Sequence, residues 1–160
     1  MIHEVVFEQV DARPLAAIRG TTSRARLARD ILRNLDVIWP LLRARGVRTR
    51  HNVVIYRGGT EDALHVEIGV EVLSEFAGTG EVVALSTPSG AVATTAHYGD
   101  YSTLSPAYAA IDRALHERGR RSAGVTWEVY GDWEDDPALR RTDIFFLLRD
   151  ELQGDAAPPI

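Results

Sequence analysis

Hydrophobic positions in the first half of the chain follow strand spacing at first and then helix spacing. Residues 5–18 hold two short apolar runs separated at Pro14, and we interpret them as one broken strand. Ser23 is a helix-capping residue type and precedes the helical stripe. Pro40 falls inside that stripe and predicts a kink or a split near Asp36. The stripe recurs every three or four residues and consists of Leu27, Ile31, Leu35, Ile38 and Leu42.

The rest of the chain predicts a hairpin and then a second copy of the same order of elements. Residues 51–59 and 63–72 alternate like strands around a Gly-Gly turn, so the first half reads strand, helix, strand, strand. Residues 91–98 begin the second copy, and 125–131 and 142–149 end it as two strands. Between them lies another amphipathic helix, whose apolar stripe is Leu104, Tyr108, Ile111 and Leu115.

The two copies align closely enough to predict a gene-duplicated fold. Each runs from a helix end through glycine into a strand that ends in tyrosine, so Tyr56 corresponds to Tyr130 and Val54 to Glu128. We therefore expect an α+β domain of two pseudo-twofold-related β-α-β-β halves, each an antiparallel sheet with one long helix. A seam between such halves is a common ligand site. The expected boundaries are 1–150 for the domain, 3–73 and 91–149 for the repeats, 74–90 for the crossover and 151–160 for a disordered tail.

Composition limits the classes of function. The chain has 160 residues and a net charge of −5, so it shows no global electrostatic match to nucleic acid or to an anionic membrane. It contains no cysteine, which excludes disulfides and thiolate metal sites. Its five histidines are scattered, and we predict neither a metal site nor a cofactor. The N-terminus lacks the pattern of a signal peptide, and no apolar run has the length of a membrane span, so we expect a cytoplasmic protein.

One carboxylate stands among aromatic residues in the segment WEVY, residues 127–130. Strand alternation places Trp127 with apolar neighbours on the face that we expect the helices to cover. Glu128 and Tyr130 then lie on the face toward the cleft, beside Val54 and Tyr56. A carboxylate in an apolar cleft with aromatic walls suits a lipophilic cation, because cation–π attraction adds about 0.5–2 kcal/mol. The alternative is that this face is wet and that Glu128 is a solvated surface acid.

Other aromatic residues are weaker candidates for the same cleft. Tyr98 and Tyr101 flank a glycine turn and would close one end of the cleft, and Trp39 would do so from the first helix or merely fill space. Tyr108 shares the apolar stripe of the second helix, so we assign it to the core. His97 is interpreted as a strand-end histidine that hydrogen-bonds the following turn, rather than as a haem ligand.

Several motifs resemble those of the GyrI-like effector-binding family, which occurs in multidrug-responsive transcription regulators and as free-standing proteins. They are HYGDYxxL at 97–104, the helix that ends at Gly119, WEVY at 127–130, PSG at 88–90 and EIGVEV at 67–72. Their order and spacing extend the resemblance from about residue 3 to residue 149. The resemblance implies two β-α-β-β halves around a cleft, with Glu128 as the ligand anchor.

The resemblance leaves three functions open. The first is a free-standing protein that captures lipophilic cationic or aromatic molecules, with Glu128 as counter-charge and Tyr56, Tyr98, Tyr101, Tyr130, Trp127 and Trp39 as walls. The second is a hydrolase of cyclopropane-bearing genotoxic natural products, in which Glu128 is the general base and Tyr130 or Tyr98 the donor. The third is an interaction protein that inhibits DNA gyrase. Because the first strand starts near Met1, we expect no helix-turn-helix domain and no direct DNA binding unless a separate regulator supplies it.

Overall fold

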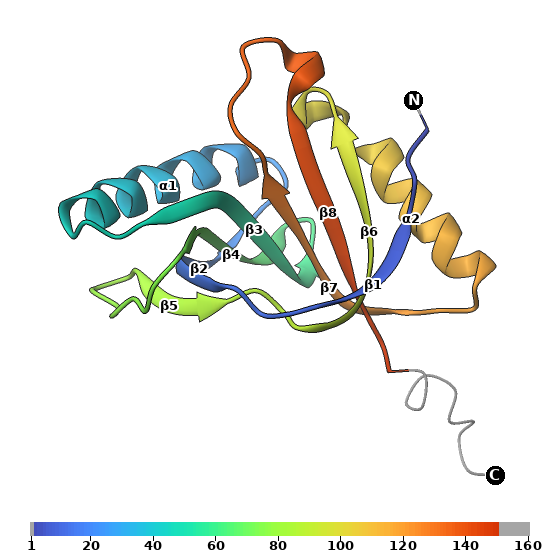
Figure 1. Cartoon of the computed structure of the whole chain (residues 1–160), viewed down its shortest axis with the longest axis horizontal. Helices are drawn as coiled ribbons and strands as arrows, with labels where there is room; N and C mark the ends of the chain where they lie inside the picture. Colours follow the sequence, from blue (N-terminus) through green and yellow to red (C-terminus); the bar gives the residue numbers. More distant parts are fainter. Residues whose placement is uncertain (1, 151–160) are drawn as a thin grey trace.

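The computed structural model describes residues 2–150 and consists of one eight-stranded antiparallel sheet with two helices (Figure 1). The α+β class predicted from the sequence is confirmed. The predicted tail, 151–160, lies outside the described residues. The strand order in the sheet is β1-β6-β8-β7-β3-β4-β2-β5. The elements are β1 Val6–Val10, β2 Pro14–Thr22, α1 Leu27–Ala44, β3 Thr49–Thr60, β4 Ala63–Val72, β5 Val83–Ser86, β6 Gly90–Tyr98, the 3₁₀ turn η1 Tyr101–Thr103, α2 Ser105–Glu117, β7 Ser122–Tyr130, the 3₁₀ turn η2 Pro137–Leu139 and β8 Arg141–Leu148.

The two β-α-β-β units, β2-α1-β3-β4 and β6-α2-β7-β8, share this sheet by pairing β3 with β7 at its centre. Val54 lies opposite Glu128 in the register. Tyr56 follows Val54 by two residues on one side of this pair, and Tyr130 follows Glu128 by two residues on the other side. The residues that the sequence alignment equates are therefore arranged around a local twofold axis between Val54 and Glu128.

The N-terminal strand region differs from the single broken strand expected from the sequence. β1 pairs with β6 in the second unit, whereas β2 pairs with β4 and β5 in the first, so the chain crosses between the two sheet edges at residues 11–13. A second linker crosses back at residues 87–89. The two linkers are joined by Arg13 N–H donating to Thr87 Oγ1 (2.8 Å) and Thr87 N–H donating to the Arg13 carbonyl (2.9 Å). β5 thus lies within the segment predicted as a plain crossover.

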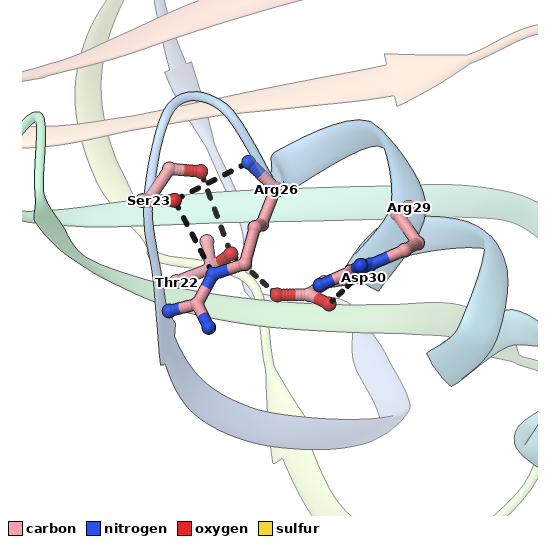
Figure 2. A network of polar contacts seen from close by, with 5 residues as sticks. All are labelled: Thr22, Ser23, Arg26, Arg29 and Asp30. Atoms are coloured by element: carbon pink, nitrogen blue, oxygen red, sulfur yellow. Dashed lines mark hydrogen bonds and ion pairs between the residues drawn. The ribbon is translucent and has the colours of Figure 1, made fainter.

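The predicted split of the first helix near Asp36 is wrong, because α1 continues for 18 residues with Pro40 inside it. Ile38 and Leu42 flank the proline and are both fully buried in one core with residues of β2 and β4, which holds the two sides of Pro40 together. Ser23 lies in the turn before the helix, where its hydroxyl accepts a hydrogen bond from the backbone N–H of Arg26 at 3.3 Å (Figure 2).

Both helices lie over the sheet face that carries Glu128. The prediction that they cover the face of Trp127 is therefore wrong. α2 packs on Ile144 and Phe146, and Ile144 is the register partner of Glu128. The opposite face is buried without a helix because the sheet curls and the strands near its two edges meet. Its core combines Leu15 and Ala17 of β2, Val53 and Ile55 of β3, Val92 of β6 and Trp127 of β7. An apolar strand face therefore did not identify the helix-covered side.

No helix within residues 2–150 is long and apolar enough to cross a membrane.

Candidate functional site

A cavity of about 720 Å³ lies over the central strands between α1 and α2. Its volume falls within the range of about 300–1,000 Å³ that is typical of small-molecule sites. β3 and β7 provide the floor with Tyr56, Glu128 and Tyr130. α1 contributes apolar side chains, among them Leu27 and Ile31. The pairing of β3 with β7 thus brings both units to one site.

Glu128 is 5% exposed and accepts hydrogen bonds from three tyrosine hydroxyls. Tyr130 Oη donates to Oε1 at 2.5 Å, and Tyr56 Oη donates to the same oxygen at 3.3 Å. Tyr108, on α2, donates to Oε2. Hydrogen bonds to an ionised acceptor are shorter and stronger than neutral ones, and three donors stabilise a negative charge that burial alone would disfavour.

The same arrangement raises the pKa of each of the three tyrosines above the ordinary value of 10.0. Burial is the largest cause, because it disfavours the phenolate, and the negative charge of Glu128 is the next. The hydroxyls of Tyr56, Tyr108 and Tyr130 therefore keep their protons at neutral pH and act as donors.

The rim of the cavity is both aromatic and charged. Tyr101 lies edge-on to Tyr130, with ring centroids 5.3 Å apart and an interplanar angle of 77°. Asp112 of α2 and Arg24, from the turn before α1, also line the cavity. Together with Glu128 this gives two carboxylates against one guanidinium, so the lining carries a net negative charge. An aromatic, acidic hollow of this kind favours cations over anions.

His97 connects the end of β6 to the turn that carries Tyr101. Its ring is 4% exposed, and Nε2 lies 3.0 Å from Thr103 Oγ1 in η1. The Thr103 hydroxyl donates to the Asp100 carbonyl at 2.6 Å, so it accepts from His97. The predicted hydrogen bond from a strand-end histidine to the following turn is therefore confirmed, and it helps to position Tyr101.

Three residues that the sequence proposed for the cleft do not line this cavity. Trp127 points to the opposite face, where its ring stacks on Phe145 at 5.0 Å. Trp39 packs in the α1 core and donates from its indole nitrogen to Asn52 Oδ1 at 2.9 Å. Tyr98 is 43% exposed and contacts Arg141. By contrast, Tyr56, Tyr101, Tyr130 and Glu128 come together as expected.

Tyr108 packs against the core of the second unit, as the sequence predicted, and its ring contacts Phe146. It also lines the cavity and donates a hydrogen bond to Glu128, which the sequence analysis did not predict. The helical stripe correctly indicated that the residue faces inward. The missed signal is its hydroxyl, because a buried tyrosine usually finds a hydrogen-bond partner, and Glu128 is a polar residue on the strands below it. Among residues 2–150, no group of three or more metal-ligating side chains is present.

A family model described as the GyrI-like small molecule binding domain matches residues 3–149. The chain belongs to the GyrI-like family. No curated protein matches the sequence significantly.

Several solved structures share the fold at low sequence identity. The EcmrR C-terminal domain is 18% identical with a TM-score of 0.75, over 93% of this chain and 99% of that one. In an EcmrR–DNA complex the identity is 17% and the TM-score 0.74, and the match covers 91% of this chain but only 57% of EcmrR. SAV2435 bound to tetraphenylphosphonium is 10% identical with a TM-score of 0.69, over 96% and 98% of the two chains. A hydrolase encoded by lin2189 from Listeria innocua is 11% identical with a TM-score of 0.60, over 91% and 92%.

Proposed function

We propose that this protein captures lipophilic organic cations in the cavity between α1 and α2, with Glu128 as the counter-charge. The observation that carries the proposal is the buried carboxylate on the floor of a 720 Å³ cavity, held by three tyrosine hydroxyls. Such a group costs free energy to bury, and its negative charge attracts a cation more strongly in a water-poor hollow than in solution.

The walls favour cations whose charge is spread over an apolar body. Leu27 and Ile31 offer aliphatic surface, and the tyrosine rings offer faces to which a delocalised cation is attracted. A small hydrophilic cation would lose its hydration without gaining such contacts. SAV2435, which shares the fold, is solved with tetraphenylphosphonium, a large cation of this type.

Calorimetric titration with tetraphenylphosphonium tests the proposal. Glu128→Gln preserves the shape of the side chain and removes its charge, and we expect it to weaken binding by roughly thirtyfold or more, as is typical when one member of a buried charge pair is lost. The matched control is Glu117→Gln, the same change at an exposed position at the end of α2, which should bind as the wild type does. Equal affinity of the Glu128→Gln variant and the wild type would remove the counter-charge role.

The second candidate is hydrolysis of a strained electrophile, such as a cyclopropane-bearing DNA alkylator. The observation that favours it is the contact of 2.5 Å between Tyr130 Oη and Glu128, which places a base and a hydrogen-bond donor at one point of the cavity. In this step the water oxygen forms a bond to the strained ring carbon, Glu128 takes the water proton, and the ring C–C bond breaks with its electron pair passing to the leaving group. Once Glu128 is protonated, the Tyr130 hydroxyl is free to donate a hydrogen bond to the leaving group, and the proton on Glu128 is then returned to that group. Incubation with such an alkylator should then yield a product heavier by one water, seen by mass spectrometry and lost in Glu128→Gln; an unchanged substrate would leave binding alone.

A further inference from the structure

A second cavity, of about 440 Å³, opens on the sheet face opposite Glu128. It lies beside the crossing of the two linkers, and Val10, Arg13 and Thr87 contribute to its wall. Trp127 also lines it. Successive residues of a strand point to opposite faces of the sheet, so the neighbours Trp127 and Glu128 on β7 line two different cavities.

Glu71 on β4 lines this second cavity and is 5% exposed. Its one ion pair within residues 2–150 joins Oε2 to Arg13 Nη1 at 3.9 Å, which is too long for a hydrogen bond. The Arg13 side chain is 59% exposed, so water weakens even this attraction. Among the described residues, no side chain or backbone group donates a hydrogen bond to the Glu71 carboxylate.

The other buried glutamates show how unusual Glu71 is. Glu67, two residues earlier on the same strand, accepts hydrogen bonds from Arg19 Nε and Arg57 Nε, each at 3.1 Å. Glu128 accepts from three tyrosines. A buried carboxylate that lacks donors is costly, and buried polar groups in folded proteins almost always have a partner. Within residues 2–150 the one fully enclosed side-chain polar atom without a hydrogen-bond partner is Thr142 Oγ1, so the Glu71 oxygens are open to the cavity that they line, and a donor held in that cavity can reach them.

The rest of the lining indicates what that donor belongs to. Trp127 and Phe145 stack nearly parallel, at 5.0 Å and 8°, and form an apolar part of the wall with Val129. Water can donate a hydrogen bond to the carboxylate but gains little free energy from the apolar wall. A molecule that carries both a donor group and an aromatic or aliphatic body makes favourable contacts with both. The charged side chains of the lining are Glu8, Asp11, Glu71 and Asp143 against Arg13 and Arg50. Asp143 is paired with Arg141 at 2.9 Å, so three carboxylates remain against two guanidiniums, which still favours a cation.

We propose that this second cavity binds primary amines with an aromatic or aliphatic body, whose ammonium group donates hydrogen bonds to Glu71 while the body lies against Trp127 and Phe145. The site is independent of the Glu128 cavity and has a different preference. Glu128 already accepts from three hydroxyls and needs only charge from a ligand. Glu71 needs N–H donors, which phosphonium and quaternary ammonium ions do not have.

The test uses 2-phenylethylamine as the probe and the Glu128→Gln protein, in which the first cavity has lost its charge. Calorimetry should show binding, and addition of Glu71→Gln should weaken it by roughly tenfold or more, because a charge-assisted hydrogen-bonded pair is lost. Glu75→Gln, the same change at an exposed position four residues further on, is the control that should not change the affinity. The N-trimethyl derivative of the probe keeps the charge and the body but has no N–H, and it should bind more weakly than the amine.

Nitrogen-15 NMR on the wild-type protein gives a second readout, which does not depend on how the glutamate variants fold. The indole signal of Trp127, assigned with a Trp127→Phe sample among the three tryptophans of the chain, should shift with 2-phenylethylamine. Shifts confined to α1 and α2 would place the amine in the first cavity and overturn the proposal. The proposal would also be overturned if Glu71→Gln left the affinity for 2-phenylethylamine unchanged, or if the Glu128→Gln protein did not bind this amine. Either result would identify water as the partner of Glu71.

Discussion

The two β-α-β-β units have the same elements but different chemistry where they meet. At the local twofold axis, the first unit places Val54, which is 1% exposed, and the second places Glu128 directly opposite it. The two helices also differ in the polarity of the side chains that they present to the cavity. α1 presents Leu27 and Ile31 to the shared cavity, whereas α2 presents Tyr108, whose hydroxyl reaches the carboxylate.

This difference shows how duplication can build an asymmetric site. The repeated backbone supplies two walls and a symmetric floor, including the pair Tyr56 and Tyr130 on either side of the axis. A single charge at the axis is then served by donors from both units. If both units kept a carboxylate, the two would lie side by side in the register, where like charges repel strongly in a poorly hydrated environment.

The largest effect is expected when the asymmetry is removed by Val54→Glu. The variant buries a second carboxylate opposite Glu128, and we expect it to lower the free energy of unfolding by about 3–5 kcal/mol, the usual cost of an uncompensated buried charge. Val54→Thr keeps the side-chain shape and adds only a hydroxyl, so it should cost about 1–3 kcal/mol. Urea unfolding measures both, and equal losses in the two variants would mean that the axis is hydrated.

Removal of one donor at a time compares the contributions of the two units to Glu128. Tyr108→Phe takes away the donor to Oε2, so we expect a loss of about 1–3 kcal/mol in the free energy of unfolding. Tyr56→Phe removes a longer bond, of 3.3 Å, to an oxygen that keeps Tyr130, and it should cost about 0.5–1.5 kcal/mol. The same urea measurements apply, and a larger loss for Tyr56→Phe would reverse this ranking.

Alkaline pH should weaken the fold through the same three phenols. Their pKa values are raised in the folded protein above 10.0, so the folded state holds these protons more tightly than the unfolded chain does. The stabilisation is complete below pH 10 and is lost as the pH rises through the folded pKa values. Spectrophotometric titration should show that three of the five tyrosines resist ionisation above pH 10 until the protein unfolds. Ionisation of all five in a single early step, with the fold intact, would contradict this.

The regular parts of the fold follow from local patterns. Alternating residues predicted β3, β4, β6, β7 and β8 closely, and the two helical stripes predicted α1 and α2, because burial on one face imposes a period on the sequence. The alignment of Val54 with Glu128 also anticipated their approach in space. Strand alternation predicted that Glu128 and Tyr130 share a face, and both line the same cavity.

Other features depend on contacts between distant segments that no local pattern contains. The helix-covered side was misjudged because the face of Trp127 is as apolar as a helix-covered face but is buried by the curled sheet itself. Trp39 was placed in the cleft, but its indole is directed instead to Asn52. The sequence analysis did not predict that β1 pairs with β6 while β2 pairs with β4. The linkers that carry the chain between the two units are joined through Arg13 and Thr87, and they show no hydrophobic periodicity that could have indicated this.

In each unit a side-chain hydrogen bond joins the end of a strand to the helical segment that follows, and the smallest expected effect concerns the residue that makes this bond in the second unit. In the first unit Thr22 Oγ1 donates to Asp30 Oδ2 at 2.5 Å (Figure 2), and in the second His97 bonds Thr103 at 3.0 Å. Only the second tie involves a histidine, and burial, followed by the adjacent His3, lowers the pKa of His97 below 6.5.

Because the folded state binds the His97 proton less tightly than the unfolded chain does, the neutral His97 ring stabilises the protein fully above pH 6.5, and this stabilisation is lost as the pH falls below that value. Protonation occurs at Nδ1, which faces His3 Nε2 at 3.0 Å, and leaves the hydrogen bond from Nε2 to Thr103 in place. The free energy of unfolding of the wild type, measured with urea, should therefore decline on acidification, and His97→Gln should reduce this decline. His116→Gln, at an exposed position in the last turn of α2, should leave the decline unchanged. An identical decline in all three proteins would assign the acid sensitivity to carboxylates, whereas a smaller decline in His97→Gln alone would assign it to protonation of the His97 ring beside His3.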